Sequence, residues 1–244
     1  MNYVLEQMPA ADSAQLHSWM ETALEMFLGY KVLVPKPPVV SLDGVGLLRK
    51  FRLRPLFLPA LSEEQMEALP IPLQWGRYLR FQERVFRRPQ KLPGKWAAFE
   101  AIPAFNPHAG RCLDDALMEE IGVNSRFDHP FSNLPFELDG GDVLAGILPK
   151  AAGVLAPLRG ELMLQSADEY NFVGNFFNFV REATGESLPD LANEFSREWC
   201  RNVTDNYYAL TVGGRDVGGL RAVNLAVRSV RWNNVSFRFL IVFP

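Results

Sequence analysis

Three histidines and two cysteines set the limits of acid–base, nucleophilic and metal chemistry in this chain of 244 residues. The histidines are His17, His108 and His129, so a Ser-His-Asp or Cys-His mechanism must use one of them. The sequence contains no nucleophile elbow, dinucleotide fingerprint, kinase motif or HExxH motif that would direct the choice. An enzyme that uses His108 or His129 is therefore our third functional hypothesis.

His108 and Cys112 have a spacing that would suit two ligands of one metal ion, and Asp114 follows closely. A zinc site needs three or four ligands in tetrahedral geometry. The residues that folding could add are His129, Asp128 and Cys200. Because a lone histidine near a lone cysteine is common background, we expect no metal and no cofactor, with His108, Cys112 and His129 as weak candidates.

Two other segments contain residue types that hold ions in other proteins. Glu137, Asp139 and Asp142 surround a Gly-Gly pair, but their spacing does not match an EF-hand loop. A tight turn with solvated acids is the favoured interpretation. The glycine-rich segment 212–219 lacks the lysine of a phosphate-binding loop and precedes no helical pattern. It is better explained as a flexible entry to a C-terminal hairpin.

Arginines form the clearest polar cluster, which we call the basic ridge. Its members are Arg77, Arg80, Arg84, Arg87 and Arg88. Four of them share one face of a helix expected from about Gln74 to Pro89. Guanidinium groups bind phosphate or carboxylate in a bidentate manner, so the ridge predicts contact with an acidic protein surface or with RNA or single-stranded DNA. A solvated face paired with Glu83 and other acids explains the same pattern equally well.

Two helical patterns between Ser166 and Tyr208 are expected to form the core that positions these residues. Ser166 and Glu169 make a capping box, and Gly185 ends the first helix. The apolar positions of that helix are Phe172, Val173, Phe176, Phe177 and Val180, widened by Phe179. The row on its other side, Asn171, Asn175, Asn178 and Glu182, is expected to be a solvated face, with a polar recognition ladder as the alternative.

The second pattern recurs every four residues after a start at Ser187-Leu-Pro-Asp190. Its members are Leu191, Phe195, Trp199, Val203 and Tyr207. This spacing predicts a second helix that packs antiparallel to the first. We therefore expect Trp199 and Phe195 to be buried against Phe172 and Phe176.

The remaining elements are predicted from start, stop and alternation signals. Helices are expected after Asp12, after Ser62 and over 111–121, and strands over 31–34, 50–58 and 161–165. Prolines 35, 37 and 38 stiffen a connector that cannot join a central sheet. Alternating apolar residues over 235–243, after an earlier run over 222–232, predict a C-terminal β-hairpin. The stretch 143–158 is apolar but contains prolines and glycines, so no element is predicted there.

Composition limits the classes that remain. Apolar residues make up 48% and charged residues 22% of the chain, which is typical of a packed protein. A net charge of −3 gives no overall attraction to nucleic acid or anionic membrane. The sequence shows no export signal, no membrane span and too few cysteines for a disulfide scaffold, which predicts a soluble cytoplasmic protein.

These patterns together predict a single α+β domain over residues 1–244, with aromatic-rich helices on a small antiparallel sheet. The absence of a catalytic signature and the abundance of aromatic residues favour a non-enzymatic subunit or adaptor. Such a protein would act through contacts with a protein partner or with its own copies. Nucleic-acid binding through the basic ridge is the second hypothesis, ahead of an enzyme.

Overall fold

The computed structural model describes residues 5, 13–75, 92–102, 115–127, 129, 143–194, 196–203, 208–214, 219–227, 229 and 235–244. The helices in these ranges are α1 (Ser13–Leu28), α2 (Leu42–Lys50), α3 (Glu63–Glu67), α5 (Ala116–Glu120), α6 (Val143–Leu155) and α7 (Ala167–Thr184). The strands are β1 (Leu53–Leu61), β2 (Gln74–Trp75), β3 (Leu92–Glu100), β4 (Glu161–Leu164), β5 (Arg197–Val203), β6 (Tyr208–Gly213), β7 (Ala222–Val227), β8 (Val235–Ser236) and β9 (Phe239–Val242).

Local capping signals correctly located several helices. At the start of α7, the Ser166 hydroxyl accepts a hydrogen bond from the Glu169 N–H at 3.1 Å, and the Glu169 carboxylate accepts one from the Ser166 N–H at 2.7 Å. Ser62 and Gln65 make the same capping box before α3. Gly185 ends α7 in the left-handed conformation, with φ of 69°. These signals work because they satisfy amide groups within one turn of the chain.

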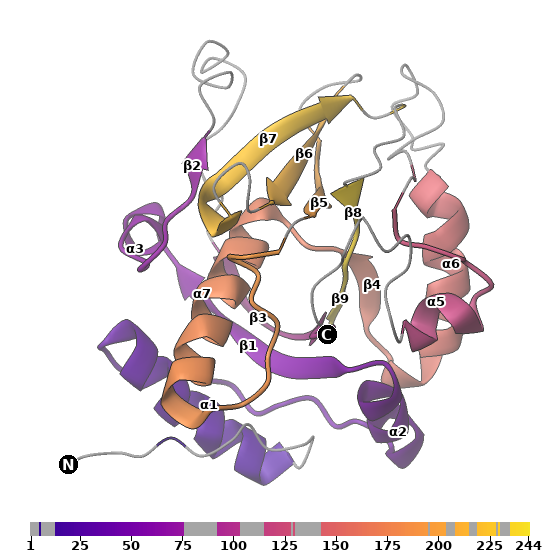
Figure 1. Ribbon diagram of the computed structural model, residues 1–244. Helices are drawn as coiled ribbons and strands as arrows, with labels where there is room; N and C mark the ends of the chain where they lie inside the picture. Colours follow the sequence, from indigo (N-terminus) through magenta and orange to yellow (C-terminus); the bar gives the residue numbers. More distant parts are fainter. Residues whose placement is uncertain are drawn as a thin grey trace.

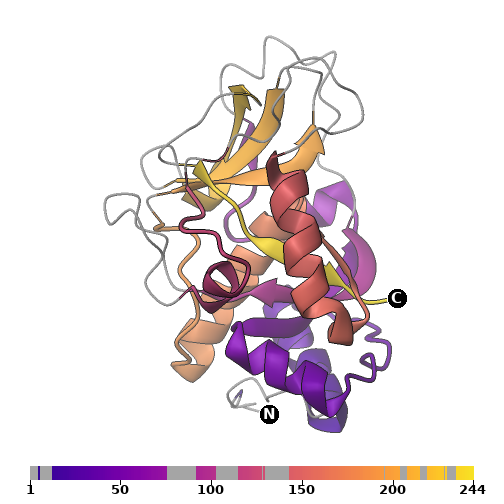
Figure 2. The same ribbon diagram turned by 90° about the vertical axis from the view of Figure 1, so that its right-hand side faces the viewer.

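The strands form two sheets, and the α+β class is confirmed (Figure 1). The first sheet has the order β1-β3-β9-β4 with antiparallel neighbours throughout. The second has the order β2-β7-β6-β5-β8, with parallel pairs at its two ends. Figure 2 shows the second sheet at one end of the molecule and α1 and α2 at the other. β1 contains Pro55 and is an edge strand, as predicted.

The C-terminal strands exist, but the predicted hairpin between them does not form. β7 pairs with β6 and β2, whereas β8 pairs with β5 in the second sheet and β9 pairs with β3 and β4 in the first. The chain therefore crosses from one sheet to the other between Ser236 and Phe239. Side chains on both faces of this crossing are buried, including Arg238. The alternation of residue types was read as one buried and one exposed face of a hairpin, so the strands were assigned the wrong pairing partners.

The helix predicted over 187–207 is also wrong. Residues 186–194 form a loop with a turn, and Arg197–Val203 is strand β5, which pairs antiparallel with β6 and has a register shift between Trp199 and Val203. A spacing of four residues is an even number, so it places side chains on one face of a strand as well as on one face of a helix. Trp199 is fully buried, as predicted. Phe195 and Tyr207 lie outside the described residues.

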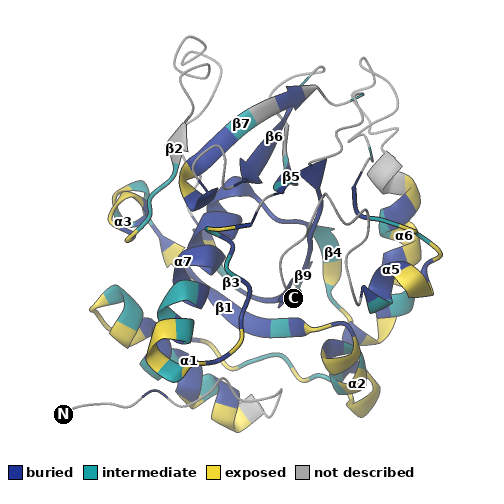
Figure 3. Ribbon diagram, in the orientation of Figure 1, coloured by how far each residue is buried: buried dark blue, intermediate teal, exposed yellow. Residues whose placement is uncertain are grey.

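Helix α7 forms the aromatic centre of the core. The Phe176 ring lies 6.2 Å from Trp19 and 5.6 Å from Phe27 of α1, and the Phe177 ring lies 5.8 Å from Phe99 of β3. The helix is therefore held between α1 and the first sheet, and most of its length is buried (Figure 3). The aromatic stripe was identified correctly, although its partners are α1 and β3 rather than a second helix.

The polar row of α7 is buried at Asn171 and Asn175, where the prediction of a solvated face is wrong, and exposed at Glu182. Asn175 is buried; its side-chain oxygen accepts from the Ile71 N–H at 2.8 Å, and its amide donates to the Ile71 carbonyl at 3.0 Å. The Asn171 amide donates to the carbonyls of Ile71 and Leu220 at 2.8 and 2.9 Å. Side-chain amides can replace the hydrogen bonds that irregular backbone lacks. Asn171 and Asn175 thus attach the segments around Ile71 and Leu220 to α7.

Helix α6 was missed because it contains Pro149. Ile147, Ala151 and Leu155 are buried at four-residue spacing, while Pro149 is exposed. An interior proline removes one helical hydrogen bond, and burial of this apolar side offsets that loss. Residues 31–34 form no strand, but the conclusion that the following prolines keep the connector out of a sheet is confirmed.

Candidate functional site

Most residues of the predicted sites lie outside the described part of the chain. This applies to Arg77, Arg80, Arg84, Arg87 and Arg88 of the basic ridge, to His108 and Cys112, and to Glu137, Asp139 and Asp142. The structure does describe Gln74 and Trp75, which form strand β2. A helix beginning at Gln74 is therefore wrong, while the basic ridge itself stays a prediction.

His129 is described, and its contacts are structural. Its Nε2 lies 2.7 Å from the Ser125 carbonyl oxygen, and its ring centre lies 5.9 Å from that of Phe237. The His129 carbonyl accepts a hydrogen bond from the Trp199 indole at 3.2 Å. These contacts connect residues 125–129 to β5 and to the β8–β9 crossing.

Neither thiol nor metal chemistry gains support within the described ranges. Those ranges contain no group of three or more His, Cys, Asp or Glu side chains arranged to hold a metal ion. Cys200 is a buried free cysteine, and burial raises the pKa of its thiol well above the usual value, followed by repulsion from Glu198. A buried thiol with a raised pKa is a poor nucleophile.

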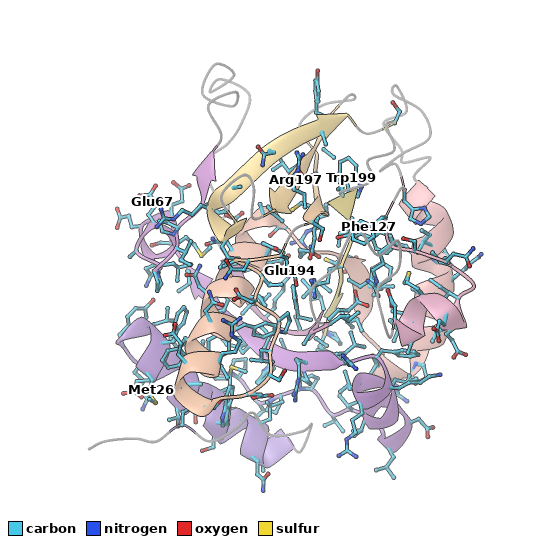
Figure 4. All side chains as sticks on the ribbon, in the orientation of Figure 1. Met26, Glu67, Phe127, Glu194, Arg197 and Trp199 are labelled. Carbon is cyan, nitrogen blue, oxygen red and sulfur yellow. The ribbon has the colours of Figure 1, made fainter. Side chains whose placement is uncertain are left out.

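The largest concentration of charge in the described structure is internal. We call it the buried ion network, and its members are Glu100, Asp115, Arg126, Glu194, Glu198 and Arg238. All six are buried. Figure 4 shows Glu194 near the middle of the molecule, away from the periphery where Met26 and Glu67 lie. Sequence analysis did not single out any of these residues as a group.

Arg126 uses all five guanidinium N–H donors. It donates to both Glu100 oxygens at 2.6 and 2.7 Å and to both Asp115 oxygens at 2.5 and 2.9 Å. The fifth donor reaches the Phe237 carbonyl at 3.2 Å. Asp115 also caps α5 by accepting from the Met118 N–H. Arg126 thus connects the end of β3, the start of α5 and the β8–β9 crossing.

Arg238 makes the equivalent connection between the two sheets. Its Nη1 donates to the Glu100 and Ile102 carbonyls at 2.8 and 3.1 Å, at the end of β3. Its Nε and Nη2 donate to Glu198 of β5, the closest pair being Nη2 and Oε1 at 2.8 Å. Nη2 also reaches both Glu194 oxygens at 3.0 and 3.1 Å. Every donor of this guanidinium is therefore satisfied without water.

The network contains four carboxyl groups and two guanidinium groups, so full ionisation would leave excess negative charge in the interior. Burial, followed by the charge of Glu198 and opposed by Arg238, raises the pKa of Glu194 to about 8. Burial also raises the pKa of Glu100, against the attraction of Arg126. At neutral pH Glu194 therefore keeps its proton. Perturbed carboxyl groups can indicate an active site, but these are sealed from solvent and fully engaged, which assigns them a structural role.

Replacing Glu194 by glutamine should flatten the dependence of stability on pH. An unfolded glutamate has a pKa near 4.3, so between about pH 4.3 and 8 the folded state binds a proton that the unfolded state lacks. This contribution to stability is complete below about pH 4.3 and is lost as the pH rises to about 8. Glutamine resembles the protonated acid and does not titrate. We expect the stability of Glu194→Gln relative to the wild type to increase by about 1–3 kcal/mol from pH 6 to pH 8.

Denaturant unfolding at several pH values measures this difference. Glu64→Gln, at an exposed position of α3, is the matched control and should follow the wild-type curve. If the wild type and Glu194→Gln show parallel curves, then Glu194 is ionised in the folded protein and the assignment of its proton is wrong.

The surface offers a different feature at the connector between α1 and α2, which we call the exposed connector (residues 29–41). The large apolar side chains with high exposure in the described chain are Met26, Tyr30, Leu33, Val39 and Leu42. All lie in the connector or at the helix ends beside it. Leu33, Val39 and Leu42 are 90%, 95% and 91% exposed, so they have almost no intramolecular contact.

The exposed connector is nevertheless attached to the body of the protein. The His17 Nε2 lies 2.9 Å from the Val34 carbonyl oxygen, and the Trp96 indole donates to the Pro35 carbonyl at 2.9 Å. Val34 is buried. Further along, Val40 lies so close to Gly44 of α2 that an added Cβ there would meet its Cγ1 at 2.5 Å. The segment is therefore held at Val34 and Pro35 near its middle and at Val40 near its end, while Leu33 and Val39 are exposed to solvent.

Comparison of the sequence with protein-family models and with curated proteins finds no match. Among the described residues, the structure contains no helix of the length and apolar character needed to cross a membrane.

Proposed function

We propose that this protein is a non-enzymatic subunit or adaptor that contacts another protein through the exposed connector. The observation that carries the proposal is the high exposure of Leu33 and Val39 on the exposed connector and of Leu42 at the adjoining start of α2. Burying a Val or Leu side chain gains about 1.5–3 kcal/mol. Isolated exposed apolar residues are ordinary, whereas several of them close together in the sequence on an attached segment favour an interaction site.

The other hypotheses receive less support from the described residues. The contacts of His129 are structural, and the buried ion network is closed to substrates. Nucleic-acid binding would depend on the basic ridge, which lies outside the described residues, so it stays the second hypothesis. A cytoplasmic location also stays a prediction, and it agrees with the free thiol of Cys200.

Removing the apolar side chains should abolish association without unfolding the protein. We expect the triple variant Leu33→Ser, Val39→Ser and Leu42→Ser to change the free energy of unfolding by no more than about 0.5 kcal/mol per site, because the side chains are exposed. Light scattering over a range of concentrations should show that the wild type self-associates. If it does not, the wild type should co-elute with a defined protein partner in size-exclusion chromatography. The triple variant should remain a free monomer.

The matched control replaces Glu64 and Glu67 by serine, both exposed on α3. That variant should associate as the wild type does. If the folded triple variant associates normally, the exposed connector is not the contact surface and the proposal is wrong.

A further inference from the structure

Three exposed side chains of the exposed connector, Leu33, Lys36 and Val39, recur every three residues. Val34 is buried and Pro37 and Val40 are partly buried, while Pro35 and Ser41 are exposed as well. Three residues per turn is the period of the polyproline II helix, which would place Leu33, Lys36 and Val39 along one edge.

Backbone features of the segment agree with a polyproline II conformation. Pro35, Pro37 and Pro38 fix their own φ angles near −65° and favour extended conformations in the residues before them. Ser41 has φ of −65° and ψ of 163°, close to polyproline II values. In the described structure, no backbone–backbone hydrogen bond joins residues 31–40 to another segment, which is also characteristic of this conformation.

We propose that the exposed connector is a preformed polyproline II ligand for a partner protein that presents an aromatic-lined groove with a carboxylate beside it. This inference rests on the proposed function and names the kind of partner. Leu33 and Val39 would lie on one edge of such a helix, about 19 Å apart over six residues of about 3.1 Å rise. Grooves with aromatic walls bind such edges in several recognition domains. Lys36 lies between the two apolar side chains and is exposed, so the groove needs an acidic group opposite it.

The attachment of the connector favours binding. His17 and Trp96 hold two successive carbonyls, and the Trp96 ring itself lies 5.7 Å from Phe57 of β1. The ligand therefore loses little conformational freedom on docking, which is the main advantage of a polyproline II segment over a flexible peptide.

A second copy of this chain is a less suitable partner for the exposed connector than a protein with an aromatic-lined groove. At about 25 cal/mol per Å², three Val or Leu side chains represent roughly 200–350 Å² of apolar surface. Stable interfaces bury about 800 Å² on each partner. The apolar edge is too small for a stable dimer by itself, but its size suits transient docking in a narrow groove.

The test measures binding of the full chain to a panel of purified SH3, WW and EVH1 domains by calorimetry. We expect at least one domain to bind. Leu33→Ser with Val39→Ser should weaken that binding at least about tenfold, since two buried apolar side chains are lost. Lys36→Glu should weaken it about fivefold at low salt and less at high salt. Arg49→Ser, exposed on α2, should bind as the wild type does.

A second variant tests the conformation rather than the side chains. Pro37→Gly with Pro38→Gly keeps Leu33, Lys36 and Val39 but frees the backbone, and it should weaken binding roughly tenfold. Equal affinity for this variant would show that the partner does not read a polyproline II helix.

The outcomes separate the inference from the proposed function. If no domain of the panel binds but the serine variants still abolish association in light scattering, the proposed function stands and the aromatic-groove partner is wrong. If the serine variants abolish self-association of the purified protein, the partner of the exposed connector is a second copy of this chain, and the aromatic-groove partner is wrong. If neither binding nor association depends on Leu33 and Val39, both proposals fail.

Discussion

Replacing Arg238 by methionine is expected to lower the free energy of unfolding by about 3–5 kcal/mol. Methionine keeps much of the apolar stem but removes all five donors of the guanidinium. Glu198 would then lose its contacts with Arg238, and the carbonyls of Glu100 and Ile102 would lose their donors. These groups are buried at the crossing between the two sheets, where an uncompensated charge has no access to water. The loss should appear in denaturant unfolding followed by far-ultraviolet circular dichroism.

A second substitution separates the charge effect from a packing effect. If the loss comes from an unpaired carboxylate, adding Glu198→Gln to Arg238→Met should recover part of the stability, because the buried charge is removed. Arg49→Met, on the exposed face of α2, is the matched control and should change stability by no more than about 0.5 kcal/mol. A stable Arg238→Met variant would show that the buried ion network contributes little to folding.

The sequence predicted the elements whose signals are local. The capping boxes at Ser62 and Ser166 and the glycine at position 185 each act within one turn of a helix, so neighbouring residues determine them. The apolar face of α7 was also predicted correctly. The element over 197–203 was assigned the wrong type, because a spacing of four residues fits both a helix and a strand.

The buried ion network could not be predicted because it depends on contacts between distant segments. Arg126 bonds Glu100 and Asp115, and Arg238 bonds residues of three other segments. Arginine and glutamate are usually exposed, so nothing in their types suggests burial. One signal was present: Arg238 stands between Phe237 and Phe239 in a strongly apolar run. A lone arginine in such a run can indicate a buried partner.

The exposure of Leu33 and Val39 in the exposed connector was not predicted from the sequence. Apolar residues of this kind are usually buried, so their types alone do not indicate exposure. Prolines 35, 37 and 38 correctly indicated that the segment would stay outside the sheets. They could not show which of its side chains would face solvent, since that depends on where His17, Trp96 and Gly44 attach it.

Trp199→Ala is expected to cost about 3–5 kcal/mol, the range for deletion of a large aromatic side chain from a packed core. Trp199 is fully buried on β5 opposite Thr211 of β6. Its indole donates to the His129 carbonyl, so the deletion creates a cavity and also leaves that carbonyl without this donor. Trp199→Phe retains most of the ring but cannot donate, and it should cost about 1–3 kcal/mol.

Unfolding in denaturant, followed by circular dichroism because the fluorescence of Trp199 is lost, measures both variants. Leu33→Ala, at a side chain that is 90% exposed, is the control and should be close to the wild type. The order of loss matters as much as its size. Trp199→Ala must lower the free energy of unfolding more than Trp199→Phe does, because only alanine leaves the space of the aromatic ring empty. That space lies in the second sheet, which the β8–β9 crossing connects to the first. Equal stability of Trp199→Ala and the wild type would show that β5 is not packed in the core, and the account of how the two sheets are held together would then be wrong.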